Sequence, residues 1–168
     1  MAITARLTAA LSWVQTGAHD LGVPSFKSAL QREMIYADGT AADQADILFA
    51  DTRTIVSGGT DDLDLAGALS TAFGQTITAA KIVAMMIVSK ATNTTNLTIG
   101  VGTNPVVGWL GGTTPTLGPI RPGGMLLRAE TGAAGICSVT AGTADILRIA
   151  NAAGAAATYD IVILGRSA

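Results

Sequence analysis

The stretch of sequence with the strongest strand signal is Thr76-Ile-Thr-Ala-Ala-Lys-Ile-Val-Ala-Met-Met-Ile-Val-Ser-Lys90. Its interior, Ile82–Val88, is an unbroken apolar run of seven residues, whereas a membrane-spanning helix needs about 20. We interpret the stretch as a strand that is apolar on both faces, as in the middle of a sandwich. One of its faces is expected to consist of Ile82, Ala84, Met86 and Val88 and to pack against Leu147, Ile149, Ile161 and Ile163.

Shorter strand signals flank this segment on both sides. In Asp61-Asp-Leu-Asp-Leu-Ala66, Asp62 and Asp64 alternate with Leu63 and Leu65, which predicts a strand with one solvated and one buried face. Residues 67–75 have the spacing of one or two helical turns, and residues 102–122 are rich in Gly, Pro and Thr, which predicts a long loop. Further strands are expected over residues 46–56, 96–101, 123–128, 135–140, 146–150 and 158–165.

These segments amount to about eight strands separated by turn residues, and the crossover helices of parallel sheets are missing. The sequence therefore predicts an all-β fold, an antiparallel β-sandwich or jelly roll over residues 46–168. Residues 1–45 are expected to form an N-terminal arm that serves for attachment, because glycines and a proline interrupt every candidate element there. An arm too broken for its own core should bury its large apolar side chains against the sandwich, a neighbouring copy or a larger partner.

Composition and charge narrow the choice of partner. The chain has 10 basic and 12 acidic residues, and nucleic acid is not expected to bind it, because phosphate contacts need a cluster of Lys and Arg. No membrane is expected as a partner either, since no apolar run is long enough to span one. Seven acids lie between Asp38 and Asp64, whereas bases outnumber acids six to three from Leu65 onward. This distribution favours contact between copies of the chain or with a large partner.

The sequence offers little for catalysis, and we predict that the protein is not an enzyme and binds no cofactor. His19 is the only histidine and lies in a turn signal, and no Gly-x-Ser-x-Gly motif or phosphate-binding loop is present. Cys137 is the only cysteine, so the chain can form no internal disulfide. Its apolar neighbours indicate a small buried hydrophobic residue rather than a reactive thiol.

Two further groups of residues are candidates for binding. Asp61, Asp62 and Asp64 could hold Ca²⁺, which prefers clustered carboxylate oxygens, but their spacing does not match an EF-hand loop and a solvated acidic strand face is the preferred explanation. The two tryptophans are interpreted as packing or interface anchors, because a sugar-binding cleft usually contains more aromatic residues. The residues expected at an interface are Trp13, Val14, Phe26, Tyr36, Trp109 and Leu110.

Six phrases of turn and strand residues stand out after the arm. They are Asp51-Thr-Arg-Thr54, Asp61-Asp-Leu-Asp-Leu-Ala-Gly67, Ala72-Phe-Gly74, Arg121-Pro-Gly-Gly124, Val139-Thr-Ala-Gly-Thr-Ala-Asp-Ile-Leu-Arg-Ile-Ala-Asn151 and Tyr159-Asp-Ile-Val-Ile-Leu-Gly165. Together they resemble small virion structural proteins of tailed bacteriophages, over roughly residues 36–168. The resemblance implies a β-sandwich or jelly roll that decorates the capsid as a cement, head-fibre or minor head protein.

The leading hypothesis from the resemblance is a capsid decoration protein that binds the major capsid protein and reinforces its lattice. Such a protein would be made in the cytoplasm of the bacterial host, would lie on the capsid surface and would act as a homo-oligomer, a trimer or a dimer. A tail or head-fibre component is the alternative within the same class. A carbohydrate-binding β-sandwich module is the alternative from another class.

Overall fold

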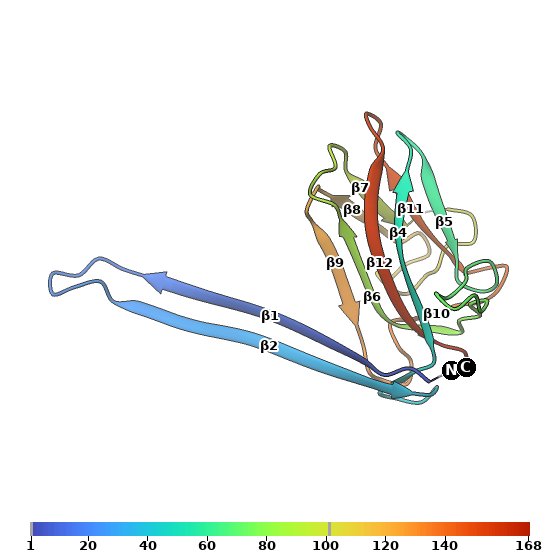
Figure 1. Cartoon of the computed structure of the whole chain (residues 1–168), viewed down its shortest axis with the longest axis horizontal. Coiled ribbons are helices and arrows are strands. Elements are labelled where there is room, and N and C mark those ends of the chain that lie inside the picture. The colour runs from blue at the N-terminus through green and yellow to red at the C-terminus, as the bar shows by residue number, and fades with distance from the viewer. Residues whose placement is uncertain (1, 101) are drawn as a thin grey trace.

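The computed structural model describes residues 2–100 and 102–168. The regular secondary structure of these residues consists of β-strands alone (Figure 1). This confirms the all-β prediction. No helix in this part of the chain is long and apolar enough to cross a membrane. The strands are β1 (Ala5–Thr16), β2 (Ser25–Asp38), β3 (Gln44–Ala45), β4 (Ile47–Ile55), β5 (Thr60–Asp64), β6 (Lys81–Ser89), β7 (Leu97–Gly100), β8 (Thr116–Ile120), β9 (Met125–Ala129), β10 (Cys137–Ser138), β11 (Ile146–Asn151) and β12 (Ala157–Arg166).

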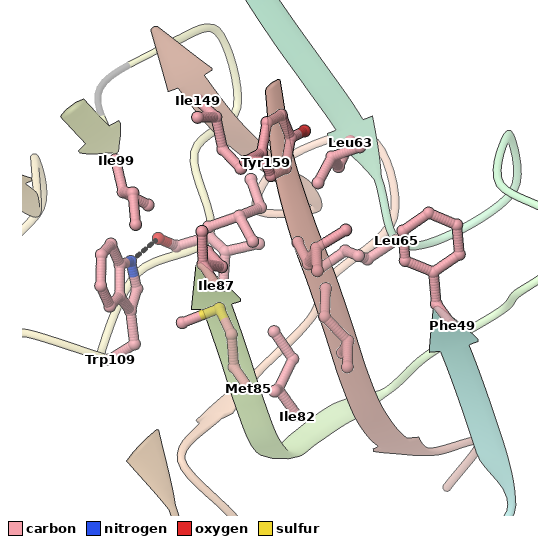
Figure 2. Close-up of a cluster of buried hydrophobic side chains, with 14 of the residues drawn as sticks. Phe49, Leu63, Leu65, Ile82, Met85, Ile87, Ile99, Trp109, Ile149 and Tyr159 are labelled. Carbon is pink, nitrogen blue, oxygen red and sulfur yellow. Dashed lines mark hydrogen bonds between the residues drawn. The ribbon is translucent and has the colours of Figure 1, made fainter. Parts of the chain in front are cut away.

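Two antiparallel sheets face each other across the main core. In sheet I, β9 and β10 pair with one edge of β6, and β12 and β4 follow on the other side. Sheet II has the order β5-β11-β7-β8. Side chains from the facing sides of both sheets point toward one another between them (Figure 2). The large buried residues of this core include Phe49, Leu63, Met85, Ile87, Ile99, Ile149, Tyr159, Ile161 and Ile163.

The strand alternation is confirmed in β5; in β6 the prediction is right for Ile82, which lies in the core, but wrong for Ala84 and Met86. Leu63 and Leu65 are fully buried, as predicted. In β6, however, Met85 and Ile87 enter the core, whereas Met86 is exposed. The reason is a β-bulge. Leu164 and Gly165 are consecutive in β12, but they pair with Ala84 and Ile82 of β6, so one extra residue of β6 lies between these two partners. The extra residue reverses the alternation of buried and exposed side chains along β6.

Two other local predictions need correction. Residues 67–75 form turns rather than a helix, and Gly67 and Gly74 have positive φ angles of 159° and 76° that break a helical path. The predicted loop 102–122 contains β8, which pairs with β7 only and forms an edge of sheet II. Proline and glycine are tolerated on such an edge, so their presence does not exclude a strand. In the predicted strand 96–101, Val101 lies outside the described residues.

The arm is a long β-hairpin. β1 and β2 pair without interruption from Ala5 opposite Tyr36 to Thr16 opposite Ser25, and residues 17–24 connect them at the tip. Figure 1 shows the hairpin leaving the sandwich near both chain ends and projecting away from it. Twelve residues at 3.4 Å per residue make this arm about 40 Å long. The glycines and proline that seemed to interrupt the arm in the sequence lie mostly in its tip.

Candidate interaction surface

The pairing of β1 with β2 gives the arm one apolar and one polar face. Residues directly opposite each other in an antiparallel pair share a face, so the odd-numbered residues of β1 lie on the same side as the even-numbered residues of β2. We call this side the apolar arm face; its apolar residues are Ala5, Leu7, Ala9, Leu11, Trp13, Phe26, Leu30, Met34 and Tyr36. The opposite face is mainly polar; it carries Arg6, Thr8, Ser12, Lys27, Gln31 and Glu33, together with the predicted interface residue Val14.

The root of the apolar arm face packs on the sandwich. Tyr36 is fully buried there, and its hydroxyl donates a hydrogen bond to the carbonyl of Val83 at 3.4 Å. Burial raises the pKa of the Tyr36 hydroxyl. Tyr36 was predicted to be an interface residue, and the structure places it inside the chain as the anchor of the arm. The residues of this second, smaller core are Tyr36, Ala45, Val83, Ala84 and Leu164, with Ala5, Leu7, Met34 and Ala129 packed against it.

Beyond the root, the apolar arm face lies in solvent. Leu30 is 71 % exposed and Phe26 is 60 % exposed, and Trp13 and Leu11 beside them are exposed as well. A two-stranded hairpin on its own is at best marginally stable in water, and a long apolar hairpin with free edges promotes aggregation. The outer half of the arm therefore presents an uncovered apolar surface.

A second uncovered apolar surface lies on the outer side of sheet I. Val162 of β12 lies opposite Met86 of β6, which in turn lies opposite Leu127 of β9, so one apolar row crosses three strands. Leu48 and Met125 extend this row into a patch, and Met125 is 60 % exposed. We call these five residues the sheet I patch. A groove of about 530 Å³ lies between the patch and the first six residues of β1.

The predicted carboxylate cluster does not converge on one point. Asp61 accepts hydrogen bonds from Arg53 Nε at 2.5 Å and from the Tyr159 hydroxyl at 2.7 Å. Asp62 accepts two hydrogen bonds from Arg148 at 2.6 Å, and Asp64 accepts one from the backbone of the nearby turn. No group of three or more metal-binding side chains occurs in residues 2–100 and 102–168. The acids on β5 are thus largely neutralised within the chain, which weakens the predicted charge attraction between copies.

These ion pairs make stability depend on pH. Burial raises the pKa of the Asp61 carboxyl, but the hydrogen bonds from Arg53 and Tyr159 outweigh this and hold the pKa below its ordinary value. The hydrogen bonds from Arg148 lower the pKa of Asp62 in the same direction. An unfolded aspartate takes up a proton near pH 4, before the folded one does. The stabilisation is therefore complete above about pH 4 and is lost as the pH falls through the lowered pKa.

We expect Asp61→Asn to lower the free energy of unfolding by about 1–3 kcal/mol at pH 6, because the two hydrogen bonds from Arg53 and the one from Tyr159 lose their charged acceptor. Between pH 5 and pH 2 the variant should lose less stability than the parent chain, since its amide does not titrate. Urea unfolding at several pH values measures both effects. Asp20→Asn, in the exposed arm tip, is the control and should change neither. If Asp61→Asn had the same pH dependence of stability as the parent chain, the hydrogen-bonded Asp61 carboxylate would not be a source of that dependence.

The other predicted residues fall in different places. Trp109 is buried in the core, and its indole N–H donates to the carbonyl of Val106 at 3.1 Å (Figure 2). It is thus a packing anchor, whereas Leu110 next to it is partly exposed. Burial raises the pKa of the Cys137 thiol to about 11 and keeps it protonated. His19 lies exposed at the arm tip, where its Nδ1 accepts a hydrogen bond from the backbone of Leu21.

Arg166 is a structural residue that the sequence did not indicate. Its guanidinium is fully buried and donates to four backbone carbonyls, those of Gln44, Thr131, Gly132 and Ala133, at 2.8–3.2 Å. Gln44 lies in β3, which pairs with the end of β2. Arg166 therefore joins the last strand of the chain to the root of the arm.

The surface that the structure points to is thus apolar and extended rather than a catalytic cleft. Comparison with protein-family models, with curated proteins and with solved structures finds no match.

Proposed function

We propose that this chain is a structural protein of a tailed-bacteriophage particle, a decoration or cement protein that binds the major capsid protein and stabilises its lattice. The proposed site of action is the capsid surface, after synthesis in the cytoplasm of the bacterial host. The observation that carries the proposal is the projecting arm with its uncovered apolar face. The proposal includes no catalytic step and no cofactor, because the arm and the sheet I patch offer binding surface rather than reactive groups.

The strand order supports a jelly roll as the finer description of the sandwich. Without the two-residue strands β3 and β10, eight strands follow the arm. Numbered one to eight along the chain, they have the order 6-3-8-1 in sheet I and 2-7-4-5 in sheet II. This interleaving of early and late strands is that of two linked Greek keys, which is common in viral capsid domains and also in lectins. Because one fold serves many functions, this order supports the proposal without deciding it.

The length of the arm supports a role in an assembly. A domain of about 125 residues has a radius of gyration near 14 Å, so the arm of about 40 Å is as long as the whole sandwich is wide. An arm of this length reaches past the boundary of its own subunit. In a symmetric lattice, where each copy meets the same neighbours, such an arm can join each subunit to the next.

The alternatives predict other partners for the same surface. A tail or head-fibre component would use its arm on tail or fibre proteins. A carbohydrate-binding module would need aromatic side chains that stack on sugars, but Trp109 is buried, the exposed Trp13 and Phe26 lie on the arm, and the exposed Phe73 lies in the turns between β5 and β6. The decoration role is favoured over the sugar-binding one because the exposed apolar surface extends along the arm.

The test is binding to particles. Purified chain is mixed with undecorated capsids of the same phage, and in parallel with isolated tails, and the particles are sedimented. We expect the full chain to sediment with capsids, and a chain lacking residues 1–35 to remain folded by circular dichroism but to stay in the supernatant. Leu30→Asp should weaken binding at least tenfold, because copies that are no longer joined by their arms bind the lattice one at a time, whereas Gln31→Asp, on the polar arm face, should bind normally. Binding of the full chain to tails alone would favour the alternative, and full capsid occupancy by the truncated chain would contradict the role of the arm.

A further inference from the structure

We propose that the outer half of the apolar arm face lies on the sheet I patch of a second copy of this chain, so that copies are joined by exchanged arms. The inference goes beyond the proposed function and gives a structural basis for the homo-oligomer expected from the sequence resemblance. It names the two surfaces that meet, the outer arm residues Leu11, Trp13, Phe26 and Leu30 and the patch residues Leu48, Met86, Met125, Leu127 and Val162.

The chain already shows how an arm face packs on this sheet. At the root, Leu7 and Met34 of the arm lie against the cluster that contains Ala84 and Leu164. Those two sheet residues are on the same outer side as the patch, because Ala84 and Met86 are two positions apart on β6, as are Val162 and Leu164 on β12. The sheet I patch therefore continues an existing contact between arm and sheet, and the groove of about 530 Å³ lies where this contact ends.

The arm of the same chain does not cover the rest of the patch. Figure 1 shows that the arm points away from the sandwich beyond its root. The pairing of β1 with β2 runs unbroken to Thr16, so the hairpin cannot fold back without losing its ladder of hydrogen bonds. Phe26 lies ten residues from Tyr36 along β2, about 33 Å from the root. The outer arm residues must then be covered by another molecule.

A second copy fits both surfaces. The outer arm, about eight residue pairs long and two strands wide, has a footprint of about 270 Å². If each of two copies gives one arm face and one sheet face, each copy contributes about 540 Å² of footprint. The solvent-accessible area that a copy buries is larger than its footprint and approaches the roughly 800 Å² per partner of a standard interface. A single one-way contact would be half as large.

The chemistry of the two surfaces also matches. Between the pair Ala5–Tyr36 and the pair Thr16–Ser25, Arg32 is the only charged residue on the apolar arm face, and the five residues of the sheet I patch carry no charge. Contact of the patch with Leu11, Trp13, Phe26 and Leu30 buries apolar area, and exposed Arg32 lies inward of these four residues, opposite Ala9. This is the favourable case for a stable homo-oligomer. Association should consequently change little with salt concentration, unlike a contact held by ion pairs.

The first test is the mass of the full chain in solution without capsids, measured by sedimentation velocity over a range of concentrations. We expect an oligomer that dissociates on dilution. Its tryptophan emission should shift to the red on dissociation, because Trp109 is buried in each chain and Trp13 is the one that becomes exposed. A chain that is monomeric at about 100 μM, well above the Kd of a standard interface, would overturn the inference.

Single variants then assign the two surfaces. Leu30→Asp on the arm and Met125→Asp on the patch should each weaken association at least tenfold, and Gln31→Asp should not, with melting curves to confirm that each variant is folded. All three residues are exposed within the chain. Mixing Leu30→Asp with Met125→Asp should restore association in part, since a mixed pair retains one intact arm on one intact patch. Normal association of Met125→Asp would indicate an arm-to-arm contact instead and would overturn the inference.

The test of the exchanged arms and the test of the proposed function can succeed or fail independently. If the chain forms the oligomer but does not bind capsids, the decoration role is wrong and the exchanged arms stand. If it binds capsids as a monomer, the decoration role stands and the exchanged arms are wrong.

Discussion

Replacing Arg166 by methionine is expected to lower the free energy of unfolding by about 3–5 kcal/mol. Methionine fills a similar volume but has no donor, so the four backbone carbonyls that Arg166 now bonds lose their partners. A buried carbonyl without a donor costs about 1–3 kcal/mol, and the nearby chain can relax to reduce the sum. The expected loss is a large share of the 5–15 kcal/mol that stabilises an ordinary domain.

Urea unfolding measures this loss. Arg166→Lys should fall between the parent chain and Arg166→Met, because an ammonium keeps the charge but lacks the planar fork that reaches several carbonyls at once. Arg128→Met is the matched control, since Arg128 pairs with Glu130 at the surface and its removal should cost less than about 1 kcal/mol. Equal unfolding midpoints for Arg166→Met and Arg128→Met would show that the buried guanidinium is not needed for stability.

Arg166 also illustrates what a sequence does not reveal. Its partners are backbone carbonyls 33–122 positions away, and carbonyls are present at every residue, so no pattern of side chains signals the contact. The residue type even argues against burial, because arginine is usually exposed unless it is paired. Only the folded backbone brings the carbonyl of Gln44 in β3 and the carbonyls of residues 131–133 to the same guanidinium.

The sequence of the arm contains the alternation of a strand, although glycines and a proline follow it. Apolar residues occupy alternate positions from Ala5 to Trp13, which is typical of a strand with one apolar face. The second strand is less regular, since Arg32 and Ser28 interrupt its apolar positions. The two faces become clear only when the register joins Leu11 to Leu30 and Trp13 to Ser28. Pairing, rather than either strand alone, defines the apolar arm face.

Where one face of a strand is solvated, the sequence alone predicts which of its residues face the core. The aspartates of β5 mark the outer face and so place Leu63 in the core. In β6 both faces are apolar, because the outer one supports the arm root and forms part of the sheet I patch. An apolar run of this kind predicts a central strand but gives no indication of which residues face the core, and a bulge changes the alternation within it.

Neighbouring methionines in β6 provide the sharpest test of this assignment. Met85 is 1 % exposed and packs in the core, whereas Met86 is 38 % exposed on the outer side of sheet I. We expect Met85→Ala to lower the free energy of unfolding by about 2–5 kcal/mol, because it removes buried atoms and leaves a cavity. Met86→Ala should cost less than about 1 kcal/mol in the same experiment, since most large losses arise from core positions.

Unfolding is best measured at low protein concentration, where copies of the chain are separate. There the difference between the two variants reports only on the fold of one chain. At high concentration Met86→Ala should lose additional stability relative to the parent chain, because Met86 belongs to the proposed contact between copies and binding stabilises the folded state by mass action. Met85→Ala should show the same loss at both concentrations. If Met86→Ala were the more damaging change at low concentration, the face of β6 that enters the core would be the one predicted from sequence, and the bulge would be misplaced.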